Sequence, residues 1–238
     1  MSKFSIIAKG VMIAMGMVEM VYADNQWRGF YSGVDARFAF NNIQLQSQQS
    51  GFTNLSDTCN ISLDSSTFAP GIQLGYMHQF PNYLVSGIEA DLTLNTNQKD
   101  TRSCNSSFNS NVYDRFTFRN HMQTSIKGRV GRVLDWNQST LLPYLTVGAS
   151  FANLGLTYEN EGGNYYSNTT TQAGWLIGAG IEWAIMSHWS LRAEYCYVDY
   201  GNAINLKIPS VYGLEDPNGN GHIDLSSNNV VVAINYWI

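Results

Sequence analysis

The chain has 238 residues and a net charge of −5 at pH 7, and charged and aromatic residues each make up 13% of it. Soluble domains usually carry about twice that share of charge, and the acidic balance argues against a nucleic-acid binder, which would show a basic face. Few charges and many Tyr and Trp residues are instead typical of a surface that faces lipid.

The first 23 residues have the pattern of a secretory signal peptide. A positive charge at Lys3 is followed by a mostly apolar run and by a small residue before a polar one. An N-terminal anchor that stays attached is the alternative, but Lys9 and Glu19 interrupt the apolar run and make it a poor transmembrane helix. We therefore expect a signal peptide over residues 1–23 and one domain over residues 24–238.

After the signal peptide, apolar residues alternate with polar or small ones in eight segments, which predicts β-strands. No stretch of about 18 consecutive apolar residues follows the signal peptide, so helical membrane spans are excluded. Each segment is long enough to cross an outer membrane at a tilt. The predicted strands are residues 29–41, 69–80, 84–95, 120–134, 142–156, 172–186, 189–200 and 230–238.

Short and long connections alternate strictly between these segments. The short ones are residues 81–83, 135–139 and 187–188, and the long polar ones are residues 42–68, 96–119, 157–171 and 201–228. Outer-membrane barrels show this asymmetry, whereas a soluble sandwich or lipocalin-like barrel has no reason to place every long loop at one end. The sequence thus predicts an all-β fold, an eight-stranded antiparallel up-and-down transmembrane β-barrel, closed because unpaired backbone groups are costly in lipid.

If the apolar face of each strand points to lipid, the other face points into the barrel, which side chains fill. Since an isolated buried charge is very costly, we predict ion pairs there, with Arg192 and Glu194 linked to Glu89, Arg129 or Glu182. A catalytic or ion-conducting role of the carboxylates is the alternative. The expected lumen charge network comprises Asp35, Arg37, Glu89, Asp91, Lys127, Arg129, Glu182, Arg192 and Glu194.

Aromatic residues gather near the predicted strand ends. We expect them to anchor the barrel at the two membrane interfaces rather than to form a ligand cage. These residues are Trp27, Tyr83, Trp136, Trp183, Trp189, Tyr200 and Trp237.

The last long connection fits the spacing of a calcium-binding loop, in which oxygen ligands recur at every second residue before a glycine. The candidate Ca²⁺ ligands are Asp216, Asn218, Asn220, His222 and Asp224. The twelfth position is a Ser instead of a bidentate Glu, and no helices flank the segment. A cluster of Asx- and Gly-rich turns is therefore the alternative.

The three cysteines cannot form a closed disulfide framework, and their spacing matches no zinc pattern. Cys59 and Cys104 fall in the first and second long connections, on the same expected side of the membrane, so a disulfide between them is plausible in an exported protein. Cys196 is expected to face the lumen as a small buried residue.

Five segments carry a resemblance to a known family: residues 27–34, 71–76, 174–182, 190–195 and 230–236. Together they resemble the small OmpA/opacity-type outer-membrane β-barrels, often called the porin family. Members usually end in Phe, whereas this chain ends in Ile238. The resemblance implies a Gram-negative outer-membrane location, contact with outer-membrane lipid, lipopolysaccharide and the barrel-insertion machinery, and a role in adhesion, host interaction or envelope integrity.

We therefore expect a non-enzymatic membrane scaffold with a filled lumen and four extracellular loops. One alternative is a small-solute channel, which a filled lumen argues against. The other is a lipid-acting enzyme, which would need a His, a nucleophile and a carboxylate near one membrane face. His188 and Ser190 come nearest to that set, but they fall at a predicted periplasmic turn. No cofactor is expected apart from the candidate Ca²⁺.

Overall fold

The structure is a computed structural model that describes residues 26–50, 56–95, 99–106, 109–136, 139–159, 165–209 and 215–238. Its strands are β1 (Gly29–Ser50), β2 (Ser56–Gln79), β3 (Leu84–Leu94), β4 (Lys99–Ser106), β5 (Asn109–Arg132), β6 (Leu134–Trp136), β7 (Ser139–Glu159), β8 (Tyr165–Met186), β9 (Trp189–Pro209) and β10 (Glu215–Trp237). Within these ranges, no helix is long and apolar enough to cross a membrane.

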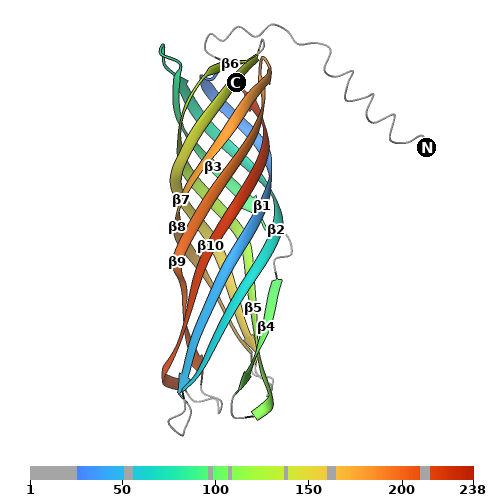
Figure 1. Ribbon diagram of the computed structural model, residues 1–238, viewed down its shortest axis with the longest axis vertical. Coiled ribbons are helices and arrows are strands. Elements are labelled where there is room, and N and C mark those ends of the chain that lie inside the picture. The colour runs from blue at the N-terminus through green and yellow to red at the C-terminus, as the bar shows by residue number, and fades with distance from the viewer. Residues whose placement is uncertain are drawn as a thin grey trace, which may run out of the picture.

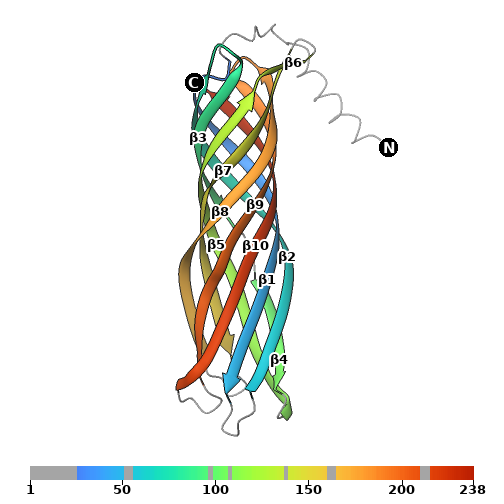
Figure 2. The ribbon, with the colours of Figure 1, turned by 60° about the vertical axis from the view of Figure 1, so that its left-hand side comes forward.

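Eight of the strands close into a ring. Each pairs antiparallel with its neighbours in the order β1, β2, β3, β5, β7, β8, β9 and β10, and β10 pairs again with β1. The two remaining strands are short additions, since β4 pairs along β5 and β6 pairs along β7. Figures 1 and 2 show the tall barrel with its tilted strands. The predicted closed, eight-stranded antiparallel barrel is confirmed.

The period-two pattern of the sequence sorts side chains between the inside and the outside of the barrel. In β10, Val230, Val232 and Ile234 are exposed on the outer face, whereas Val231 and Ala233 are buried inside. The outward residues of the other strands continue this surface as a band that we call the apolar belt. It includes Phe30, Val34, Phe38, Ile72, Leu74, Ile88, Met122, Ile126, Leu145, Val147, Phe151, Trp175, Ile177 and Ile181. A continuous apolar outer face is what a lipid-facing barrel requires.

The two ends of the barrel differ. At the turn end, uppermost in Figure 1, β2 passes to β3 through four residues, in which the Phe80 amide donates to the Leu84 carbonyl at 2.8 Å. Tyr83 takes a positive φ of 64° in this turn. A second tight turn joins β8 to β9. The predicted turn at 135–139 is partly wrong, because Asp135 and Trp136 pair with the start of β7 as strand β6.

The predicted long loops are also wrong over most of their length. The ladder between β1 and β2 runs without a break from Gly29 to Ser50, and the β1–β10, β9–β10, β5–β7 and β7–β8 ladders also extend past the apolar belt. The ladders of β3 end with that strand at Leu94, and the β8–β9 ladder ends at Trp175. Ser, Thr, Asn and Gln in these segments lack the apolar alternation that marks a buried strand, yet nothing prevents their backbones from pairing. We call these paired extensions the surface hairpins.

Candidate functional site: the barrel lumen

Alternation brings the charged residues into the lumen. Glu89 and Asp91 lie two residues apart on β3, and Glu89 is the cross-strand partner of Lys127 on β5. On the opposite wall, Arg192 of β9 is the cross-strand partner of Glu182 on β8. All nine residues of the expected lumen charge network are buried, none more than 7% exposed.

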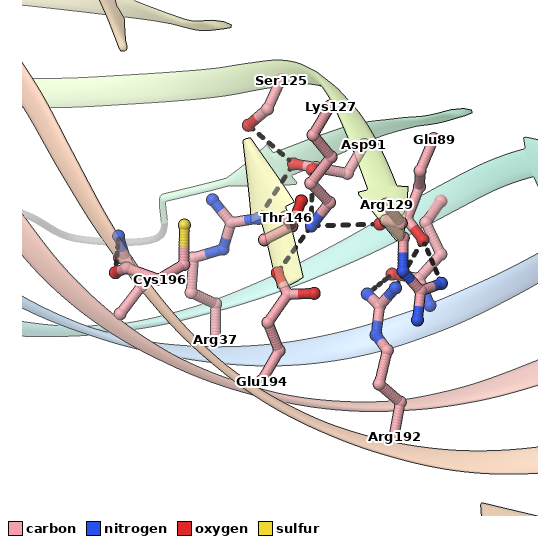
Figure 3. Close-up of polar contacts among 12 residues, drawn as sticks. Arg37, Glu89, Asp91, Ser125, Lys127, Arg129, Thr146, Arg192, Glu194 and Cys196 are labelled. Carbon is pink, nitrogen blue, oxygen red and sulfur yellow. Dashed lines mark hydrogen bonds and ion pairs between the residues drawn. The ribbon is translucent and has the colours of Figure 1, made fainter. Parts of the chain in front are cut away.

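Lys127 forms the centre of one part of the network, as Figure 3 shows. Its Nζ lies 2.7 Å from Glu194 Oε1, 3.1 Å from Glu89 Oε1 and 3.5 Å from Asp91 Oδ2. Asp91 also accepts from Arg37 Nη2 at 2.9 Å. One ammonium thus joins carboxylates of β3 and β9 across the lumen.

Glu89 forms the second centre. Its Oε2 accepts from Arg192 Nη1 at 2.5 Å and from Arg129 Nη1 at 3.2 Å, and the Tyr31 hydroxyl donates to the same oxygen. Arg129 continues the chain with Nη2 2.6 Å from Glu182 Oε2. Its guanidinium also lies 3.8 Å above the centre of the Tyr144 ring, a cation–π contact. Glu89 therefore touches three cations, counting Lys127.

Two members of the network differ from the sequence-based expectation. Glu194 pairs with Lys127 and accepts from the Tyr144 hydroxyl at 2.6 Å, instead of pairing with Arg129. Asp35 is buried but forms no ion pair, and neither of its carboxylate oxygens has a hydrogen-bond partner. Its carboxylate lies over Gly71, its cross-strand neighbour on β2, where an added Cβ atom would come within 2.6 Å of Asp35 Oδ2. The network thus includes eight of the nine expected residues.

Neutral polar residues that the sequence analysis missed complete the network. Ser190 donates to Glu182 Oε1 at 2.5 Å and Asn235 donates to the same oxygen at 2.7 Å. Gln73 links Asn235 to Arg192, because its Nε2 donates to Asn235 and its Oε1 accepts from Arg192. Ser190 and Gln73 lie an even number of residues from Arg192 and Gly71, so the alternation that marks the inward face would have found them.

An apolar cluster closes the lumen at the turn end. We call it the apolar plug, and it consists of Trp27, Tyr31, Met77, Val85, Val133, Leu142, Ala184 and Trp237. The Trp27 ring meets the Trp237 ring edge-on at 5.4 Å, and the Trp27 amide donates to Gln79 Oε1 at 3.2 Å. The segment before β1 thus turns into the mouth of the barrel.

The apolar plug corrects the expectation for the aromatic anchors. Trp27 and Trp237 lie inside the barrel, and Tyr200 is buried as well, where its hydroxyl lies 2.9 Å from Ser150 Oγ. Four of the seven aromatic residues remain exposed on the outer face: Tyr83, Trp136, Trp183 and Trp189. Strand ends place aromatic residues near an interface, but the inward or outward side depends on register.

The described side chains leave one small cavity beside the charged centre, on the side of the surface hairpins. It is lined by Arg37, Lys127, Glu194 and the buried thiol of Cys196, among others. It has room for about one water molecule. The lumen is therefore packed with side chains along its charged centre and its apolar plug.

The structure brings no catalytic pair together at the His188 turn. His188 is exposed and stacks on Tyr236 at 5.9 Å between ring centres. Ser190 points inward, where it donates to Glu182 and accepts from Trp237 Nε1 at 3.0 Å. His188 lies in the turn before β9 and stacks on the outward-facing Tyr236, whereas Ser190 is buried in the lumen, so the two side chains lie on opposite sides of the wall.

The candidate calcium segment is not a loop over its whole length. Residues 215–237 form β10, and Asn220, His222 and Asp224 are cross-strand partners of residues on β9. Apart from Asp224, the side chains of the candidate ligands, namely Asp216, Asn218, Asn220 and His222, lie outside the described part. Where side chains are described, no group of three or more His, Cys, Asp or Glu is placed to hold a metal ion. Ca²⁺ binding stays a prediction.

The disulfide also stays a prediction. The backbone places Cys59 on β2, opposite Ser47, and Cys104 on β4, opposite Asp114. Both positions belong to the surface hairpins, at the same end of the barrel. The two side chains lie outside the described part of the structure.

Comparisons with known proteins agree with this architecture. The pattern of a family described as "Outer membrane protein beta-barrel domain" matches residues 11–236. The 31 kDa outer-membrane immunogenic protein of Brucella melitensis is 25% identical over 179 residues, which cover 74% of this chain and 72% of that protein. Among solved structures, the outer membrane protein OprG from Pseudomonas aeruginosa superposes with a TM-score of 0.55 at 12% identity, covering 90% of this chain and 99% of that one.

Proposed function

The chain belongs to the outer membrane protein β-barrel domain family, and on that premise we propose that it is a non-enzymatic scaffold that displays surface hairpins for adhesion or host contact. Its location is the outer membrane of Gram-negative bacteria. Because such barrels have short periplasmic turns, we assign the turn end to the periplasm and the surface hairpins to the outside.

The packed lumen is the observation that carries this proposal. Lys127, Glu89 and Arg129 join the walls of the barrel across its centre, and the apolar plug fills the periplasmic end. Ion pairs between opposite walls thus occupy the lumen at that level. The packing therefore favours a scaffold over a solute channel.

The surface hairpins supply the functional surface in this proposal. The β1–β2 ladder continues for ten residue pairs beyond Phe40, an exposed outward residue of β1 next to the apolar belt, and ends at Ser50 opposite Ser56. At about 3.3 Å per residue and a tilt near 40°, these pairs add about 25 Å of height above the belt. The Brucella relative is described as immunogenic, which supports exposure of this end to the outside.

The first experiment combines gel mobility, surface proteolysis and conductance. Unboiled outer membranes should show a folded species of altered mobility, and protease added to intact cells should cut only in the surface hairpins. Purified protein in planar bilayers should conduct no more than a protein-free bilayer. Steady conductance from the unmodified protein would contradict the scaffold proposal and favour a channel.

Adhesion is then tested with cells that display the protein. Bacteria that express the full chain should bind host cells or extracellular matrix more strongly than the same strain carrying a barrel whose β1–β2 hairpin is shortened to residues 41 and 65. The ladder register allows this deletion, because Asn41 and Ser65 are cross-strand partners. Equal binding by all single-hairpin deletions, at equal surface amounts, would contradict an adhesive role.

We also propose that residues 1–23 are removed during export, so that the mature chain begins at Asp24. Trp27 would then lie three residues from the free N-terminus, which allows its ring to enter the barrel mouth. Intact-mass measurement of the protein from outer membranes tests this. A mass that includes residues 1–23 would show a retained N-terminal segment.

A further inference from the structure

Beyond the apolar belt, the barrel wall divides into two sheets. β3 ends at Leu94, and the ladder between β8 and β9 ends where Trp175 pairs with Asp199. Strands β9, β10, β1 and β2 remain paired in one sheet, and β4, β5, β7 and β8 in the other. Figure 1 shows the β1–β2 and β4–β5 hairpins apart from each other at its lower end. In the described part of the chain, the surface hairpins thus form two four-stranded sheets.

A bend in β9 produces the split from β8. Gly201 has a positive φ of 54°, and its amide donates to Asp199 Oδ1 at 2.8 Å. The register between β9 and β10 shifts twice at this point, between Ile223 and Ser226. Bulges of this kind bend a strand and increase its twist, so β9 turns away while β8 continues along β7.

Tyr200 covers the lumen at the base of the split. Its ring lies over Gly174 of β8, where an added Cβ atom would come within 2.7 Å of Tyr200 Cδ1. Its hydroxyl lies 2.9 Å from Ser150 Oγ on β7. A partner that enters the split from outside therefore meets Tyr200 before it meets the charged centre.

Beyond Gly174, β8 is accessible from the side that faces β9. In the described structure its backbone from Tyr165 to Ala173 pairs with β7 alone. The inward side chains of Thr170 and Gln172 are half-buried, whereas their cross-strand partners on β7 are fully buried. Since alternate residues of an antiparallel strand direct their backbone groups to opposite sides, about half of these groups face the split. We call Tyr165–Ala173 the open β8 edge.

Among the strands that border the two splits, β8 lacks the features that usually protect an edge. Natural edge strands carry charges, prolines or bulges, which hinder pairing with another chain. The open β8 edge contains no charged residue and no proline, and three of its residues are Thr, which favours strands. By contrast, β9 is bulged and contains Lys207 and Pro209, β4 contains Lys99, Asp100 and Arg102, and β2 beyond the end of β3 contains Asp57, Asp64 and Pro70.

We propose that the open β8 edge binds an extended segment of an extracellular protein as an added β-strand. In such complexes the backbone ladder supplies affinity, and the side chains of alternate residues supply specificity. The exposed side chains of Ser167, Thr169 and Thr171 carry no charge, so the partner segment should be uncharged and rich in β-branched residues, which pair well with Thr across strands. This inference deepens the proposed function and rests on its assignment of the hairpins to the outside.

A second copy in the same membrane does not fit this edge. Two barrels with the same orientation are related by a rotation about the membrane normal, so their β8 strands cannot run antiparallel. With strands tilted by about 40°, two β8 strands in contact would cross at about 80°, whereas paired strands differ by about 25°. A copy on a facing cell would satisfy the geometry, and aggregation of cells would reveal it.

Peptide binding to refolded protein in detergent micelles tests the proposal. The probe is a capped ten-residue peptide that alternates Thr and Val, and the control peptide has Pro at two central positions, where it cannot donate to a ladder. Hydrogen–deuterium exchange with mass spectrometry should show that about four amides of residues 165–173 become protected when the probe binds. The control peptide should bind at least about tenfold more weakly, as expected for two lost hydrogen bonds.

Thr170→Pro and Thr171→Pro test the edge itself. Adjacent residues direct their N–H groups to opposite sides, so one of the two changes removes a donor from the open β8 edge. At least one variant should lose the protection, while slow exchange of residues 175–186 shows that the barrel remains folded. Ser62→Pro on β2 is the matched control and should keep the protection. Binding that survives both β8 changes, equal loss in the Ser62 variant, or protection outside residues 165–173 in the unmodified protein would each overturn the proposal.

The test is separable from that of the proposed function. Absence of adhesion with the peptide protection intact would contradict the adhesive role alone. Adhesion by a protein whose open β8 edge no peptide protects would contradict only this inference. Aggregation of cells that display the protein, abolished by the β8 variants, would identify a facing copy as the partner and overturn the assignment to another protein.

Discussion

The charged centre of the lumen and the apolar plug at its turn end fill the same barrel by different means. In the centre, Lys127 and Glu89 make several charged contacts each, and their partners come both from the neighbouring strand and from β9 across the lumen. In the apolar plug, Trp27 and Trp237 pack with few polar demands. A network of buried charges needs all its members, whereas packed apolar side chains lose stability roughly in proportion to the volume removed.

This difference explains how each region depends on its sequence. Removing one partner of a buried ion pair leaves an uncompensated charge, which costs more than the pair itself contributes. Removing part of an apolar side chain leaves a cavity, and neighbouring groups partly collapse into it. The centre should therefore specify which strands face each other, and the apolar plug should mainly seal the end.

Glu89→Gln should have the largest effect. The change leaves Lys127, Arg129 and Arg192 with one negative charge fewer between them, and we expect the free energy of unfolding to fall by about 3–5 kcal/mol. Urea unfolding in lipid vesicles, followed by Trp fluorescence, measures it. Asp135→Asn, a change at an exposed carboxylate, is the control and should stay within about 0.5 kcal/mol.

Trp27→Ala tests the apolar plug. The ring is fully buried, so we expect a loss of about 3 kcal/mol, at the lower end for a large aromatic residue because the site lies at the end of the barrel. Conductance in planar bilayers should stay at background, since the charged centre still fills the lumen. Trp136→Ala, on the exposed outer face, is the matched control.

Conductance in the Trp27 variant would change the comparison between the two regions. It would show that the apolar plug, and not the ion pairs, keeps the lumen closed. A stability loss below 1 kcal/mol would instead show that the N-terminal segment contributes little to the folded barrel.

Arg192→Lys should have an intermediate effect. Arg192 donates to both Glu89 and Gln73, and a single ammonium on a flexible chain does not reproduce two fixed donors. We expect a loss of about 1–2 kcal/mol in the same unfolding experiment. Arg132→Lys on the exposed face should be neutral, and an equally neutral Arg192→Lys would mean that charge alone, without geometry, holds this part of the network.

The sequence predicted the barrel well because its signal is local. Strand alternation has a period of two, so Val230 to Trp237 could be assigned to inner and outer faces without knowledge of any partner strand. The same alternation identified the inward charges, including Lys127 and Glu194. Strand closure followed from the need to pair every backbone group in lipid.

What the sequence could not predict depends on relations between strands. Glu194 meets Lys127 across the lumen because of the stagger between β5 and β9, which no local pattern encodes. Trp27 precedes the first alternating segment, so nothing in the pattern placed it inside. The sequence predicts loops where the surface hairpins lie, because Ser, Thr and Asn segments that face water show no apolar alternation. Their backbones nevertheless pair as strands.

Asp35→Asn should have the smallest effect and the opposite sign from Glu89→Gln. Asp35 has no ion pair and no hydrogen-bond partner for either carboxylate oxygen, so its burial costs free energy that no contact offsets. Replacing it by a neutral isostere should leave the free energy of unfolding unchanged or raise it by up to about 1 kcal/mol. The measurement is again urea unfolding in vesicles. A loss of about 2 kcal/mol or more would show that Asp35 belongs to the charged centre after all, through a contact formed in the membrane. The centre would then depend on all nine of its inward charges, and the contrast with the apolar plug would be sharper.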